Sequence, residues 1–147
     1  MHLTLKFIGE VSDEKLPPIK EALRGVASAA PVELSFQGVG YFPNERRPRV
    51  FWVGMHASDN LAPLAAQVES VLEPLGIKPE KRAYVPHLTL GRFKSTNGLP
   101  RLQAEVAALP STTFGHWQAS EFFLYQSKLS PRGAEYAKLE RYAFVRS

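Results

Sequence analysis

The residues of this chain that could do chemistry lie in a tetrapeptide, His-Leu-Thr-Leu, that occurs twice, at residues 2–5 and 87–90. In a β-strand, side chains alternate between faces, so each copy puts its histidine and threonine on one face and its leucines on the other. The imidazole and the hydroxyl then lie roughly 7 Å apart along the strand. Two such strands facing a common cleft predict two histidines and two hydroxyls that converge on one small anion.

Histidine is the side chain whose unperturbed pKa, about 6.5, lets it give or take a proton near neutral pH. A pair held across one substrate can divide the work, one ring acting as general base and the other as general acid. His2 and His87 are therefore the candidate catalytic residues. Thr4 and Thr89 are candidate substrate-binding residues, because hydroxyls can donate to phosphoryl oxygens.

Arg92 follows the second copy and is a further candidate for substrate binding. If the strand is regular, Arg92 falls on the side of Leu88 and Leu90, away from His87; a bulge at Gly91 would change its direction. The other two histidines lack the full motif: His56 runs into a turn, and no hydroxyl accompanies His116. We interpret both as structural or surface residues.

A zinc site is the main alternative for two recurring histidines. Threonine is a poor zinc ligand, neither copy contains a carboxylate, and the chain has no cysteine. The chain also lacks a Gly-x-Ser-x-Gly element and a glycine-rich phosphate loop. The pattern favours acid–base catalysis without a metal or another cofactor.

Composition indicates an ordinary globular protein: 147 residues, 44% hydrophobic and 22% charged, fit one domain with a real core. No apolar run is long enough to span a membrane, and the first residues do not resemble a secretion signal. With no cysteine either, we expect a cytoplasmic protein. The net charge of +4 includes two clusters, which suit a phosphate-bearing or nucleic-acid partner or are simply charged surface. They are Arg46, Arg47 and Arg49, and Lys78, Lys81 and Arg82.

Hydrophobic periodicity predicts an α+β fold, because helices interleave with strands that could pair as hairpins. Expected strands cover residues 2–8, 32–36, 49–55, 87–93, 114–118, 121–126 and 135–145. Expected helices start near 14 and end between 25 and 29, and cover about 61–75 and 102–109. Residues 49–55 are apolar on both faces and should form a central strand, whereas residues 38–44 read as a turn-rich loop. The two motifs open similar blocks, which predicts two lobes with a central cleft, within a single domain spanning 1–147.

The paired His-x-Thr motifs resemble those of the two-histidine phosphoesterases, in particular the bacterial and archaeal RNA 2',3'-cyclic phosphodiesterases, also known as 2'-5' RNA ligases. Residues 2–11, 38–55, 86–93 and 123–136 (HLTLKFIGEV, GVGYFPNERRPRVFWVGM, PHLTLGRF and FLYQSKLSPRGAEY) are similar to segments of that family, in the same order. The resemblance covers most of the chain.

The resemblance implies a bilobal α+β fold in which two antiparallel or mixed sheets face a central cleft, with helices on the outside. It implies metal-independent hydrolysis of a 2',3'-cyclic phosphate, on RNA ends or small nucleotides, to a 2'-phosphomonoester. By motif position, His2 would protonate the departing 3'-oxygen, His87 would activate water, and Thr4 and Thr89 would bind the phosphoryl oxygens. The division of roles between the histidines rests on the resemblance alone.

Family members usually have a strand and a helix before the first motif, and we expect this element to be missing ahead of His2. We therefore expect an exposed apolar surface near the first motif; the family is monomeric, but this surface would also permit a dimer. Two other functions stay open. The same groups could join RNA ends through a 2'-5' linkage, or the protein could bind RNA without catalysis through Tyr41, Phe42 and Trp52. Because Trp52 lies in the expected central strand, it could equally belong to the core.

Overall fold

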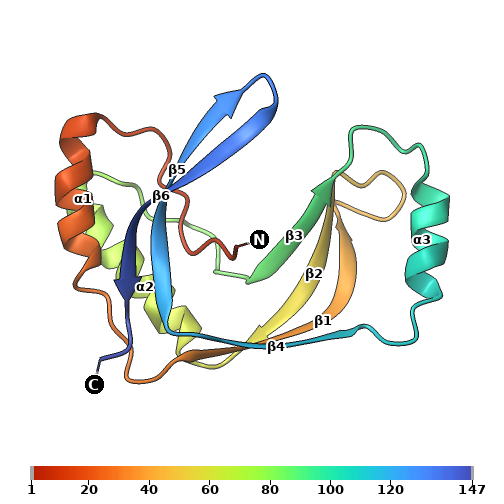
Figure 1. Cartoon of the computed structure of the whole chain (residues 1–147), viewed down its shortest axis with the longest axis horizontal. Coiled ribbons are helices and arrows are strands. Elements are labelled where there is room, and N and C mark those ends of the chain that lie inside the picture. Colours follow the sequence, from red (N-terminus) through yellow and green to blue (C-terminus); the bar gives the residue numbers. More distant parts are fainter. Residues whose placement is uncertain (1, 147) are drawn as a thin grey trace. The chain divides into compact units, whose positions relative to one another are not determined.

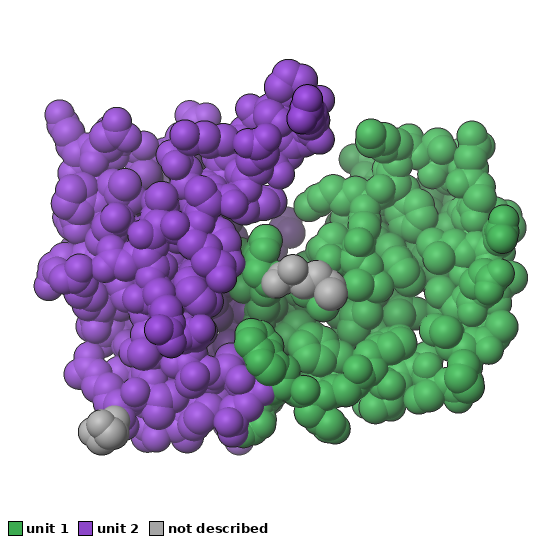
Figure 2. All heavy atoms as spheres, viewed as in Figure 1, with its two compact units in different colours: residues 1–4, 33–57, 85–117 green, residues 5–32, 58–84, 118–147 purple. Residues whose placement is uncertain are grey.

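The computed structural model describes residues 2–146, which form two compact units, each with its own sheet (Figures 1 and 2). Unit 1 draws on residues 1–4, 33–57 and 85–117, and unit 2 on 5–32, 58–84 and 118–147. Helices and strands alternate along the chain, and the predicted α+β class is confirmed. No helix in the described part of the chain is both long and apolar enough to cross a membrane.

Unit 1 is a four-stranded sheet in the order β3-β2-β1-β4, accompanied by one helix, α3 (Figure 1). Its elements are β1 (Val32–Phe42), β2 (Val50–Ala57), β3 (His87–Arg92), α3 (Leu99–Ala107) and β4 (Thr113–Ala119). The predicted central strand is confirmed as β2, which pairs antiparallel with both β1 and β3. Buried side chains on one side of β2, Val53 and Met55, give this sheet its core face.

The loop predicted for residues 38–44 is wrong for residues 38–42, which continue strand β1 to its end at Phe42. A register shift between Phe36 and Val39 inserts a bulge at Gly38, whose φ of 74° suits glycine. The glycine signal therefore marks an irregularity within the strand and not its end. Tyr41 stacks on Phe51 of β2 at 5.2 Å between ring centroids.

Unit 2 packs two helices with a β-hairpin. Its elements are α1 (Leu16–Leu23), α2 (Leu61–Leu72), β5 (Glu121–Ser130) and β6 (Gly133–Ala143), with single 3-10 turns at Asp13–Lys15 and Glu73–Leu75. The helices were predicted correctly, although α1 ends a few residues earlier than expected. Apolar residues at helical spacing form the core with the end of the chain, and each is at most 3% exposed: Ile19, Leu23, Leu64, Leu72 and Phe144.

The strand predicted for residues 2–8 does not form. A strand needs a neighbouring backbone to complete its hydrogen bonds, and in the described part of the chain every sheet ladder joins two of the strands β1–β6. The expected alternation survives over residues 2–5, since His2 and Thr4 are exposed and Leu3 and Leu5 are half-buried.

Side-chain contacts hold the segment that follows the first motif against other parts of unit 2. Lys6 is the main contact: its Nζ lies 2.8 Å from Glu69 Oε2 and donates to the Lys78 carbonyl at 2.7 Å, and its side chain is only 7% exposed. The approach to Glu69 is an ion pair without hydrogen-bond geometry. The next residue, Phe7, is 83% exposed. The wider apolar surface expected near the first motif, and the dimer that it would permit, stay predictions.

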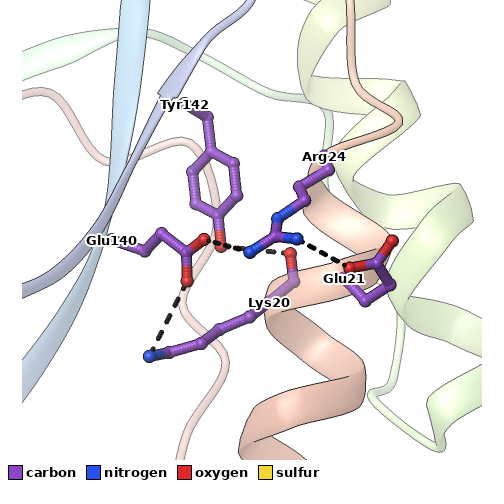
Figure 3. Close-up of polar contacts among 5 residues, drawn as sticks. All are labelled: Lys20, Glu21, Arg24, Glu140 and Tyr142. Atoms are coloured by element: carbon purple, nitrogen blue, oxygen red, sulfur yellow. Dashed lines mark hydrogen bonds and ion pairs between the residues drawn. The ribbon is translucent and has the colours of Figure 1, made fainter.

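An ionic network joins β6 to α1 in unit 2 (Figure 3). Arg24 donates to Glu140 at 2.9 Å, Lys20 Nζ lies 3.7 Å from the same carboxylate, and Arg24 also bonds Glu21. The Tyr142 hydroxyl donates to the Lys20 carbonyl at 3.2 Å. The hydrogen bond from Arg24, and then its charge, lower the pKa of Glu140 below the usual value of a glutamate.

We predict that Glu140→Gln lowers the stability of unit 2 at neutral pH. A carboxyl group whose pKa is lower in the folded state stabilises the fold above its unfolded pKa, and this contribution is lost as the pH falls through the folded pKa. Urea unfolding of the variant and the wild type should therefore differ at pH 7 and converge in acid. Glu105→Gln, which removes an α3 carboxylate that makes no ion pair within the described residues, is the matched control. An equal effect of the two substitutions would contradict the role of the network.

Candidate functional site

The second motif lies on β3, as predicted, with its two polar side chains on one face of the sheet. In the β2–β3 ladder His87 lies opposite Gly54 and Thr89 lies opposite Trp52. Residues opposite each other in an antiparallel ladder share a face, and Trp52 and Gly54 are two residues apart on β2. His87 is exposed, Thr89 is half-buried, and Leu88 points to the core face with Val53.

A bulge in β3 brings Arg92 to the same face. Phe51 lies opposite Gly91 and Trp52 lies opposite Thr89, so Leu90 is an extra residue without a partner on β2. Arg92 then lies opposite Val50, which shares the face of Trp52 and Gly54. Of the two orientations left open for Arg92, the structure shows the one that a bulge produces, and the extra residue is Leu90, next to Gly91. His87, Thr89 and Arg92 form what we call the β3 site.

The ring of His87 is held in one tautomer. Its Nδ1 lies 3.1 Å from the carbonyl oxygen of Val85. A carbonyl can only accept a hydrogen bond, so Nδ1 carries the proton in the neutral ring, and the lone pair of Nε2 is left free. A neutral imidazole held in this way is suited to act as a base through Nε2.

The first motif belongs to the same compact unit as the β3 site. His2 and Thr4 are exposed and fall in unit 1, although the segment that follows them belongs to unit 2 (Figure 2). Contacts within unit 1 thus unite both His-x-Thr pairs, which lie more than 80 residues apart in the sequence.

The two remaining histidines differ in their position. His56 is exposed on β2 and, two residues beyond Gly54, it shares the face of the β3 site; its partner on β1 is Ser35. His116 is exposed on β4. His56 has no hydroxyl two residues after it on its strand, so it lacks the pairing seen in the two motifs.

Trp52, which by sequence could belong to the core or to a binding surface, lies on the face of the β3 site. It is half-buried and shares a face with His87 and Thr89, opposite to the core residues Val53 and Met55. A signal was present in the sequence. Alternation around Val53 and Met55 would have separated Trp52 from the core side of β2.

Two arginines of unit 1 lie in the turn that joins β1 to β2. Arg46 and Arg47 lie exposed in the turn between β1 and β2, where their backbone N–H groups both donate to Asn44 Oδ1 at 3.0 Å. Burial raises the pKa of Tyr84, shortly before β3, to about 12, so this phenol is neutral at physiological pH. Within residues 2–146, no three His, Asp or Glu side chains are grouped so that they could hold a metal ion.

Comparisons with known proteins point to one family. The profile of the 2'-5' RNA ligase superfamily matches residues 1–130. The RNA 2',3'-cyclic phosphodiesterase of Archaeoglobus fulgidus is 41% identical over 139 residues, which are 95% of this chain and 77% of that protein. The crystal structure of TT0787 of Thermus thermophilus is similar, with a TM-score of 0.75, 31% identity, and coverage of 97% of this chain and 77% of that one. So is Escherichia coli LigT complexed with 3'-AMP, with a TM-score of 0.73, 27% identity, and coverage of 99% and 77%.

The bond from His87 to Val85 leads to a spectroscopic prediction. Neutral His87 should be found as the Nδ1–H tautomer, because only a protonated Nδ1 can donate to the Val85 carbonyl. Long-range ¹H–¹⁵N correlation spectra of histidine-labelled protein above the titration range would show this directly. His116, which makes no hydrogen bond through its ring within the described residues, serves as the internal reference. A dominant Nε2–H tautomer at His87 would contradict the assignment.

Proposed function

The chain belongs to the 2'-5' RNA ligase superfamily, and on that premise we propose that it hydrolyses RNA or nucleotide 2',3'-cyclic phosphates to 2'-phosphomonoesters. The β3 site is the observation that carries the proposal. It combines a ring with a free Nε2, a hydroxyl and a guanidinium on one sheet face. The name of the A. fulgidus relative, an RNA 2',3'-cyclic phosphodiesterase, supports the same reaction.

In the proposed mechanism His87 is the base. Its Nε2 takes a proton from a water molecule as the water oxygen attacks phosphorus, and the bond between phosphorus and the 3'-oxygen breaks. Protonated His2 gives its proton to the departing 3'-oxygen, so the product is a 2'-phosphomonoester with a free 3'-hydroxyl. One proton is taken and one is given, and the two rings exchange their protonation states in each turnover. Each such transfer contributes about 10²- to 10⁴-fold to the rate.

The other groups of the two motifs bind the phosphoryl group. The hydroxyls of Thr4 and Thr89 donate to the non-bridging oxygens, and the guanidinium of Arg92 balances their negative charge. Hydrogen bonds of this kind gain strength as charge moves onto these oxygens in the transition state. The substrate carries its own anionic phosphoryl group, so acid, base and cation suffice, and the reaction requires no metal ion.

The proposal treats residues 1–147 as one catalytic domain, since the segments that build the two units alternate along the chain. Its partners are RNA ends or small cyclic nucleotides. A cytoplasmic location suits these substrates and a chain without cysteine.

Ligation is the second candidate, because the superfamily takes its name from 2'-5' RNA joining. The same groups would then guide a 5'-hydroxyl of RNA in place of water, with the chemistry otherwise unchanged. Water is present at a far higher concentration than RNA ends, which favours hydrolysis. Incubation of a cyclic phosphate with an excess of 5'-hydroxyl RNA distinguishes the two, since joining would yield a longer strand and no 2'-phosphomonoester.

Alanine substitution tests the catalytic pair. His2→Ala and His87→Ala should each lower kcat by at least about 10²-fold, because each removes one proton-transfer group. His56→Ala and His116→Ala, which replace exposed histidines outside the motifs, should retain near-normal turnover. Release of 2'-AMP from adenosine 2',3'-cyclic phosphate, followed by chromatography in the presence of a chelator, measures all four. Full turnover by the double variant of His2 and His87, or activity only with added metal, would refute the proposal.

Substitution of Arg92 tests the consequence of the bulge. Arg92→Gln should raise KM for a cyclic nucleotide by roughly tenfold, because the phosphoryl group loses a charge-assisted contact. Arg92→Lys should recover part of this loss, since it restores charge without the planar fork. Arg101→Gln removes an exposed arginine of α3 and is the matched control. Unchanged KM and kcat in Arg92→Gln would show that this side chain does not face the substrate.

A further inference from the structure

Trp52 is the one large aromatic side chain paired directly with a residue of the β3 site. It lies opposite Thr89 in the β2–β3 ladder, so the Cβ atoms of the two residues are about 5 Å apart on the same face. Its side chain is half-buried, while the next residue, Val53, is only 6% exposed on the other face. Trp52 therefore belongs to the surface that presents the motif.

The absence of a side chain at Gly40 gives the indole its place on the sheet. A Cβ atom at Gly40, the partner of Trp52 on β1, would overlap Cζ2, Cε2 and Cη2 of the ring. A Cβ atom at Gly54 would only touch the ring, at 3.7 Å from Cζ3. The six-membered ring thus lies against the backbone of β1, in space that any side chain at Gly40 would fill. An indole in this position turns one face toward the strands and the other away from them.

The polar atom of the indole is unused. Within residues 2–146 the Nε1–H of Trp52 makes no hydrogen bond, and this nitrogen is not fully buried. Buried tryptophan usually finds a partner for this donor. Here the donor is open to solvent, which fits a side chain that meets a ligand better than one that only fills the core.

We propose that Trp52 is the stacking surface for the nucleobase of the substrate, an inference that rests on the proposed function of the β3 site. The ring lies over β1, two strand spacings or about 10 Å from β3. A nucleotide with its phosphate at His87 and Thr89 is long enough to reach this ring with its base. Every base can stack on an aromatic face, so the site binds nucleotides without distinguishing one base from another.

Fluorescence provides the direct test, because the chain contains only two tryptophans, Trp52 and Trp117. In Trp117→Phe, which removes the exposed ring of β4, all indole emission comes from Trp52. The probes are the products 2'-AMP and 2'-CMP, and the base-free control is 1-O-methylribose 2-phosphate. Both nucleotides should quench Trp52 in a saturable way and bind about tenfold more tightly than the base-free phosphate. Equal quenching and equal affinity for all three ligands would overturn the proposal.

Kinetics of Trp52 variants separate a substrate contact from a structural role. Trp52→Leu should raise KM for all four cyclic nucleotides by about tenfold and leave KM for the base-free cyclic phosphate unchanged. Trp52→Phe keeps a stacking ring and should recover most of the affinity. A fall in kcat that is equal for nucleotides and the base-free substrate would show that Trp52 only supports the sheet, and would refute the inference.

The two proposals fail in different ways. If Trp117→Phe and the wild type do not hydrolyse any 2',3'-cyclic phosphate, the proposed reaction is wrong, whatever the fluorescence shows. If they do hydrolyse it and the base has no influence on quenching or on KM, the reaction stands and the role of Trp52 is wrong.

Discussion

The register between β2 and β3 is the constraint on which the site depends. Side chains alternate along a strand, so a shift of one residue moves every following side chain to the other face. The extra residue Leu90 produces such a shift after Thr89, and it turns Arg92 toward the face of His87 and Thr89. A cation, a hydroxyl and an imidazole thereby share one surface over a stretch of six residues. Without the bulge, the arginine would face the core side of the sheet.

The two faces of this sheet differ: one forms the core and the other is accessible to ligands. Strand β2 carries its buried residues Val53 and Met55 on one face, and this leaves the other face free for Trp52 and its glycine neighbours. Glycine normally weakens a strand, but at Gly40 it makes room for the indole. The ladder fixes the backbone of His87, and the hydrogen bond from its ring to the Val85 carbonyl fixes the tautomer of the ring. Each polar group of the β3 site is therefore oriented by the ladder or by a bond to the main chain, which is what acid–base chemistry requires.

Periodicity in the sequence was enough to predict the helices and most strands, because alternating and helical patterns of apolar residues reflect which face each element buries. The repeated motif likewise identified the candidate catalytic residues. Three features escaped. The segment at 2–8 has strand-like alternation, but it belongs to neither sheet of the described chain. Tyr41 and Phe42 continue β1 past a glycine bulge that resembles a turn in sequence. The place of Leu90 in the ladder depends on the partner strand, so no local pattern could specify it.

The central claim is that His2 and His87 act on one bound phosphoryl group, although they are far apart in the sequence. Titration of histidine-labelled protein with 2'-AMP, followed through the ring resonances of its four histidines, tests this claim most directly. We expect the signals of His2 and His87 to shift together with a single dissociation constant. His116, on β4, should stay unchanged. A shift at only one of the two motif histidines, or two different dissociation constants, would contradict the account.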